Sequence, residues 1–186
     1  MSEDQNEELS YEDVIAILVA AQGIEATVVG GQAINFWGEY FRDRAKEDLA
    51  QFAPFTSKDI DYFGLAAAAQ QLADKLGGKA VFPEPEDHTP NSAIVQAEIN
   101  GRQAKIDFLG GVLGVRPSEM GDGALLIVID HESAGLNIKV SIRVLHPLLC
   151  LKSRAANMIT LRRADDVTKR QYAVRSSFYV NTSFGV

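Results

Sequence analysis

The sequence predicts an α+β fold with a short mixed sheet flanked by helices and a C-terminal helical pair. Three observations carry this expectation. Short apolar runs alternate with helical periodicity in the first half, an Asn-Gly hairpin signal stands in the middle, and two helical patterns follow. The chain has 186 residues, 46% of them hydrophobic, which suffices for one core. We expect a flexible acidic N-terminus over 1–9, a core over 10–145 and a helical segment over 146–186.

The first half of the chain predicts the order helix, strand, helices, strand and helix. Ser10 begins the run S-Y-E-D, which resembles a capping box with Asp13 in place of the usual Glu or Gln. An apolar run then ends at the pair Gly30-Gly31, which predicts a short buried strand before a turn. The expected helices cover 11–22, 32–40, 42–52 and 65–76, and the expected strands cover 25–29 and 57–63.

The second half is rich in predicted strands. Asn100-Gly101 between two alternating runs is the strongest short-range hairpin signal in the chain. Pro147 suits the first turn of a helix, where its missing N–H costs nothing. The expected strands cover 80–82, 93–99, 102–109, 124–129 and 136–145, and the expected helices cover 147–161 and 165–177.

Composition and charge exclude several classes of protein. Lys and Arg number 18 and Asp and Glu number 25, so the formal net charge is −7. This balance argues against broad, nonspecific binding of nucleic acid through a basic surface. The single cysteine, Cys150, excludes an intrachain disulfide and a multi-cysteine zinc site. No apolar run approaches the roughly 18 residues of a membrane span, so we expect a cytoplasmic protein without a membrane partner.

The pair Gly30-Gly31 stands directly between an apolar strand and a helix. Backbone N–H groups at a helix N-terminus, with no Cβ in the way, form an anion site that suits phosphate. A tight turn needs the same two glycines. Both interpretations stay open for the pair taken alone.

Three aspartates form the second pattern. In Asp59-Ile60-Asp61 the two carboxylates share one face of a strand while Ile60 enters the core. Like charges held so close raise each other's pKa unless a cation lies between them, and Mg²⁺ with a nucleotide phosphate is the usual partner. The alternative is a solvated strand edge. Asp107 lies in an apolar strand, where a charge is costly unless it is paired, metal-bound or at an exposed end.

The chain contains, in this order, an apolar strand, Gly-Gly, a helix, Asp-Ile-Asp on a strand and Ile-Asp-Phe on a hairpin strand. This order resembles that of the nucleotidyltransferase superfamily typified by DNA polymerase β. The resemblance covers roughly 11–161 and is closest to small prokaryotic AbiEii-like toxins and related minimal nucleotidyltransferases. It implies a polymerase-β-like fold and Mg²⁺-dependent transfer of a nucleoside monophosphate from NTP to a hydroxyl. The implied acceptor is a tRNA end or a protein side chain. The implied setting is toxin–antitoxin or phage defence, with a cognate antitoxin as partner.

The resemblance also implies a role for each residue that matches the motif. Gly30 and Gly31 would hold the triphosphate. Asp59 and Asp61 would bind two Mg²⁺ ions. Asp107 would complete the metal site and help to deprotonate the acceptor hydroxyl, so all three aspartates are expected to be catalytic.

Other positions match the family less fully. Ser57 matches the small hydroxyl residue that the family often has, but Phe55 stands where an arginine is common. Lys152, with Arg154 second, is the expected basic contact to the nucleotide, although a lysine on an amphipathic helix is often solvated. Phe55 and the long insertion over 37–55 favour the main alternative, a degenerate family member that binds nucleotide or a partner without turnover. A metal-binding regulatory module is a third interpretation.

Overall fold

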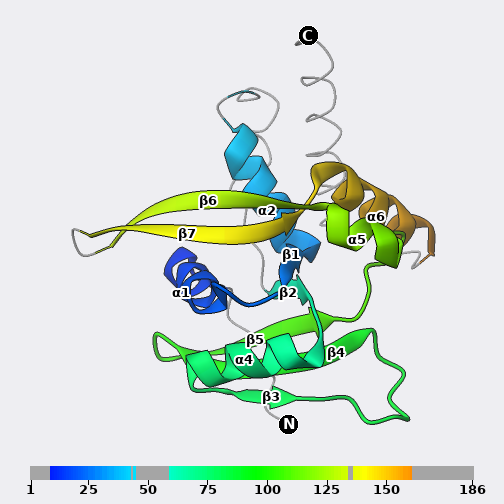
Figure 1. The fold of residues 1–186 in the computed structure, drawn as a ribbon, viewed down its shortest axis with the longest axis horizontal. Helices are drawn as coiled ribbons and strands as arrows, with labels where there is room; N and C mark the ends of the chain where they lie inside the picture. The colour runs from blue at the N-terminus through cyan, green and yellow to red at the C-terminus, as the bar shows by residue number, and fades with distance from the viewer. Residues whose placement is uncertain (1–8, 43, 45–58, 134–135, 161–186) are drawn as a thin grey trace.

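A computed structural model of the chain describes residues 9–42, 44, 59–133 and 136–160 (Figure 1). These residues form one sheet and the helices packed on it. The strands are β1 (Thr27–Val29), β2 (Ile60–Phe63), β3 (Lys79–Val81), β4 (Asn91–Ile99), β5 (Arg102–Leu109), β6 (Ala124–Ser133) and β7 (Leu136–Leu145). The helices are α1 (Tyr11–Ala21), α2 (Gly30–Phe41), α4 (Ala66–Leu76), α5 (Pro117–Asp122) and α6 (Pro147–Thr160).

The sheet is mixed, as expected for an α+β fold. Its strand order is β3-β4-β5-β2-β1-β7-β6. Strands β2 and β5 are parallel, as are β1 and β7, whereas β1–β2 and both hairpins are antiparallel. In Figure 1, α4 lies against β4 and β3, and α5 and α6 lie together at the other end of the sheet. Among the described helices, none is long and apolar enough to cross a membrane.

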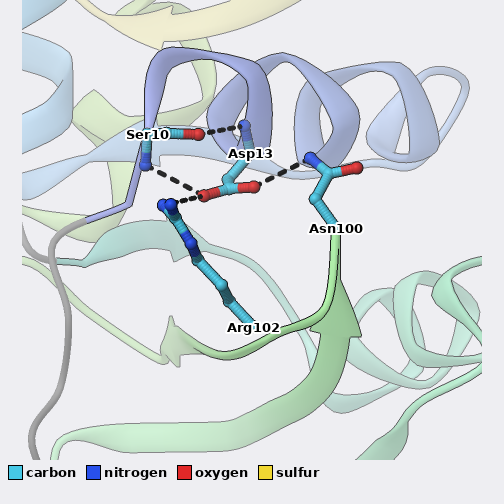
Figure 2. A network of polar contacts seen from close by, with 4 residues as sticks. All are labelled: Ser10, Asp13, Asn100 and Arg102. Atoms are coloured by element: carbon cyan, nitrogen blue, oxygen red, sulfur yellow. Dashed lines mark hydrogen bonds and ion pairs between the residues drawn. The ribbon is translucent and has the colours of Figure 1, made fainter.

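Helix α1 begins with the capping box that the sequence predicts. Ser10 Oγ accepts from the Asp13 N–H at 3.1 Å, and Asp13 Oδ2 accepts from the Ser10 N–H at 3.0 Å. The Asp13 side chain is only 1% exposed and also accepts from Asn100 Nδ2 at 2.8 Å and Arg102 Nη1 at 3.3 Å (Figure 2). One carboxylate therefore ties α1 to the turn between β4 and β5.

That turn is the expected Asn-Gly hairpin. Asn100 and Gly101 have φ values of 51° and 79°, as a two-residue turn with positive φ at both positions requires. The tight turn pairs Ile99 with Arg102, and this register places Ile94 opposite Asp107. The face on which Asp107 lies is thus set by local turn chemistry.

The observed elements differ from the expected ones at several places. Strands β1, β2 and β4 begin at Thr27, Ile60 and Asn91, so Asp59 precedes β2 and does not lie on the strand as expected. Helix α2 begins at Gly30 and not at Gln32, because a positive φ at Gly30 turns the chain from strand to helix without a loop. Helix α5 was not expected, since six residues are too few to show a helical period. Strand β6 continues past Ile129 to Ser133 because it pairs with β7 along its whole length. Two expected helices lie outside the described residues: the one over 42–52, except for Arg42 and Arg44, and the one over 165–177.

The network around Asp13 makes a stability prediction. Burial by itself would raise the pKa of Asp13, but hydrogen bonds from Asn100 and Ser10, with the Arg102 guanidinium, hold it below its ordinary value of 3.8. The stabilisation is therefore complete above about pH 4 and is lost as pH falls through the lower folded pKa. Asp13→Ala should lower the free energy of unfolding by about 2 kcal/mol at pH 7. Urea denaturation at pH 7 and pH 3 checks this, and an equal loss at both would contradict it.

Candidate functional site

Asp61 and Asp107 lie side by side at the centre of the sheet. They are register partners on the parallel strands β2 and β5. Their neighbours Ile60 and Ile106 are fully buried on one face, so the two carboxylates project from the opposite face. Asp107 therefore lies on the same face of the sheet as Asp61, as expected, while Asp59 precedes β2.

Gly30 lies directly against the Asp61 carboxylate. Val29 ends β1 opposite Asp61, and Gly30 follows as the first residue of α2 with a φ of 63°. A Cβ added to Gly30 would overlap Asp61 Oδ2 and come within 2.9 Å of Asp61 Cγ. Both the backbone conformation and the available space thus require glycine at this position. Gly31 is buried in the first turn of α2 and is not among the described glycines with positive φ.

The surroundings of Asp61 disfavour its negative charge. Burial, the largest cause, and the neighbouring carboxylates of Asp107 and Asp59 raise the pKa of Asp61 from 3.8 to about 6. The positive charges of Arg154 and Lys105 act in the opposite direction. Carboxylates with raised pKa values in a cluster are typical of functional sites. This arrangement is suited to a bound cation, which would relieve the repulsion.

Asp107 has partners that the sequence did not single out. Asn91 Nδ2 donates to Asp107 Oδ1 at 3.0 Å, and Lys105 Nζ lies 3.3 Å from the same oxygen. Lys105 stands two residues before Asp107 on one strand, so alternation alone places both on one face. Asn91 carries no such signal, because its approach depends on the pairing of β4 with β5.

A cavity of about 380 Å³ opens beside Asp61. Gly30 and Asp61 line one side, and Ser153, Arg154 and Asn157 of α6 line another. Those three α6 positions recur at helical spacing and therefore share one face of the helix. The volume falls in the range of about 300–1,000 Å³ that is usual for small-molecule sites.

The structure corrects the expectation for Lys152. Its Nζ lies 2.6 Å and 2.8 Å from the two carboxylate oxygens of Glu119, which ties α6 to α5. The hydrogen bonds from Lys152, the largest cause, and from Arg116 lower the pKa of Glu119 to about 2. Two residues apart on a helix, Lys152 and Arg154 point in different directions. Arg154 faces the cavity, and Lys152 does not line it.

The remaining expected site residues are placed only in part. Asp59 precedes β2 and is close enough to raise the pKa of Asp61. Within the described ranges, no three His, Cys, Asp or Glu side chains lie close enough together to hold a metal ion. The three-carboxylate cluster expected from Asp59, Asp61 and Asp107 is therefore not formed in this arrangement. Ser57 and Phe55 lie outside the described residues.

Comparisons with known proteins add little. Neither a protein family nor a curated protein matches the sequence. Among solved structures, the chain is similar to the Megavirus polyadenylate synthase, with 18% sequence identity and a TM-score of 0.47. The match covers 90% of this chain and 30% of that protein, so the chain spans less than a third of its length. A likeness at this level carries no argument about function.

A pair of glycine substitutions tests the contact between Gly30 and Asp61. Gly77 has nearly the same φ, 65° against 63°, but a Cβ there meets nothing within 4 Å. Gly77→Ala should cost about 1 kcal/mol, the cost of a left-handed alanine. Gly30→Ala should cost about 3 kcal/mol, because the new methyl group also displaces Asp61. Urea denaturation measures both losses.

The cycle is completed by Asp61→Ala alone and in the Gly30→Ala background. Removing the carboxylate should raise stability more in the Gly30→Ala background than in the wild type, since only there does it also remove the overlapping atoms. Equal losses at Gly30 and Gly77, with the same effect of Asp61→Ala in both backgrounds, would show that the contact is unimportant.

The raised pKa of Asp61 predicts a pH dependence of stability. Its folded pKa, about 6, exceeds the ordinary 3.8, so the folded protein binds the proton more tightly than the unfolded chain. Asp61 is therefore increasingly destabilising as pH rises from about 4 to about 6, and the penalty persists above that. Asp61→Asn should raise the free energy of unfolding by about 2 kcal/mol at pH 8 and leave it nearly unchanged at pH 4.

Denaturation with EDTA present keeps metal ions out of this comparison. Asp122→Asn, at an exposed position of α5, is the matched control and should change stability little at either pH. If Asp61→Asn stabilises the protein equally at both pH values, the negative charge of Asp61 is not what destabilises the folded state.

Proposed function

We propose that the chain is a metal-dependent nucleotidyltransferase that moves a nucleoside monophosphate from NTP to a hydroxyl group. One observation carries the proposal. The carboxylates of Asp61 and Asp107 share a register position at the centre of the sheet, and a helix begins directly against them at Gly30. Carboxylates beside a helix N-terminus are suited to a phosphate that arrives with a cation.

The first turn of α2 supports a phosphate contact. Val29, the N-cap residue, makes no side-chain hydrogen bond to the turn, so it leaves the leading N–H groups to other partners. The missing Cβ at Gly30 leaves room for the Asp61 carboxylate beside this turn, so a cation held by that carboxylate would lie next to a phosphate at the helix N-terminus. Arg154 on the cavity wall adds positive charge on the α6 side. These groups would bind and orient the triphosphate in the cavity.

The donor set fits Mg²⁺ that is bound together with the nucleotide. Mg²⁺ usually takes one or two carboxylates from the protein and completes its shell with phosphate oxygens and water. Asp61 and Asp107 would be those carboxylates, with Asp59 adding negative charge. When bound, Mg²⁺ supplies charge neutralisation at the triphosphate and lowers the pKa of a bound hydroxyl.

The protein's own part is orientation and electrostatics. Asp107 would accept the proton of the acceptor hydroxyl, and the cavity between α2 and α6 would hold the nucleotide in line. The choice of RNA or protein as acceptor, the AbiEii-like relationship and a cognate antitoxin rest on the sequence resemblance.

A second candidate is a protein of this fold that binds nucleotide without turnover. It is favoured by the ion pair of Asp107 with Lys105, whose Nζ lies 3.3 Å from Oδ1 and already offsets part of the negative charge that a cation would need. It is also favoured by the lack of a three-carboxylate cluster in the described part of the chain.

Label transfer distinguishes the two candidates. The full chain is incubated with Mg²⁺, each α-labelled NTP and a cell extract that supplies RNA and protein acceptors. The proposal expects label on a macromolecule and release of pyrophosphate. Asp61→Asn and Asp107→Asn should each reduce labelling by at least about 100-fold. Asp122→Asn is the control and should leave labelling unchanged.

Calorimetry with NTP and Mg²⁺ decides the remaining outcomes. Binding without label transfer to any acceptor would favour the second candidate. Absence of both binding and labelling would overturn the proposal altogether.

A further inference from the structure

Strand β4 carries a bulge next to the candidate site. Its register with β5 is regular from the turn down to the pair Ala93–Phe108, and the next pair is Asn91–Leu109. Ser92 is therefore an extra residue on β4 with no partner on β5. Bulges of this kind bend a strand and redirect a side chain, and they recur beside functional sites.

The bulge decides which face Asn91 occupies. Ile94 lies opposite Asp107, so with regular alternation Ser92 would be the next residue on that face and Asn91 would point to the buried side. The extra residue reverses this order. Asn91 instead pairs with Leu109, two residues from Asp107 on the same face, and its Nδ2 reaches Asp107 Oδ1 at 3.0 Å.

Ser92 holds the bulge in place. Its hydroxyl lies within donor distance of two carbonyl oxygens, 2.8 Å from Gly64 O and 3.2 Å from Phe108 O. Gly64 directly follows β2, and Phe108 lies on β5. Nearby, the Gly110 N–H donates to Pro90 O at 3.1 Å. The bulge is thereby tied to the ends of the two strands that carry Asp61 and Asp107.

The two partners of Asp107 differ in what they contribute. Lys105 has a flexible, half-exposed side chain whose Nζ lies 3.3 Å from Oδ1 and 3.4 Å from Oδ2. Asn91 is partly buried, is neutral and makes the shorter contact through a side chain with few rotatable bonds. A neutral donor can hold the carboxylate in one orientation while leaving its negative charge for a cation.

From this geometry we infer that Asn91 is a positioning residue for Asp107, placed by the bulge that Ser92 holds. The inference rests on the proposed function in so far as Asp107 acts on substrate. Asn91 itself touches the carboxylate and needs no contact with the nucleotide. Its role is to fix the orientation of Asp107 before substrate binds, which reduces what must be ordered in the reaction.

Two substitutions separate positioning from folding. Asn91→Leu keeps the approximate size of the side chain and removes the donor without adding a charge beside Asp107, and Ser92→Ala removes the hydroxyl that holds the bulge. Gln96→Ala, at an exposed position of the same strand, is the matched control. Crystal structures of the wild-type chain, Asn91→Leu and Ser92→Ala give the first measurement. We expect the Asp107 carboxylate to change rotamer in both variants while the strands stay in place.

The second measurement is steady-state label transfer. Asn91→Leu should lower kcat about 10–100-fold with KM for NTP within about threefold, and Ser92→Ala should show a smaller loss of the same kind. Gln96→Ala should match the wild type. Thermal melting shows whether the variants remain folded, and a purely structural role would lower the melting temperature without changing kcat.

The two measurements test different claims. If the wild type transfers no label, the proposed function fails, and the crystal structures still decide whether Asn91 orients Asp107. An unchanged Asp107 rotamer in both variants, or an unchanged kcat in an active enzyme, overturns the inference.

Discussion

The close contact between Gly30 and Asp61 is the constraint on which the candidate site depends. Strands β1 and β2 are only three and four residues long, and both lie at the centre of the sheet. Helix α2 begins at Gly30, directly after Val29, the last residue of β1. Its N-terminus therefore lies at the Asp61 carboxylate, with no loop between the strand and the helix. Only a residue without Cβ can turn the chain there at positive φ and leave space for the carboxylate. A larger residue would separate the helix end from the carboxylates.

The pKa values of two aspartates, Asp13 and Asp61, are shifted in opposite directions. Asp13 is almost completely buried, yet its carboxylate accepts hydrogen bonds from Ser10, Asn100 and Arg102 that outweigh the cost of burial, and its pKa is lowered. Asp61 is half-buried beside Asp107 with no comparable donor among the described residues, and its pKa is raised to about 6. The first arrangement stabilises the fold by joining α1 to a hairpin. The arrangement around Asp61 lowers the stability of the folded protein, as is usual at sites that bind a charged ligand.

The sequence by itself determined the features that depend on neighbours along the chain. The capping box at Ser10 and the Asn100-Gly101 turn follow from side chains and φ preferences within four residues. Alternation within Asp-Ile-Asp predicted which residue enters the core, because side chains on a strand alternate between faces. The mixed sheet followed from the order of such segments. The helix expected to start at Gln32 was misplaced by two residues, since nothing local shows that Gly30 turns the chain alone.

Only the tertiary structure decided how distant segments meet. Parallel pairing of β2 with β5 puts Asp61 beside Asp107, and such a register has no local signal because its partners lie far apart in the chain. Lys152 was expected at the nucleotide, but its partner Glu119 lies 33 residues away on α5, so only packing reveals the pair. The direction of Asn91 depends on a single extra residue in β4, which reverses its face. The local sequence pattern thus determines on which face of its own strand or helix a charged side chain lies. The pairing of distant strands and helices determines which charged side chains come into contact.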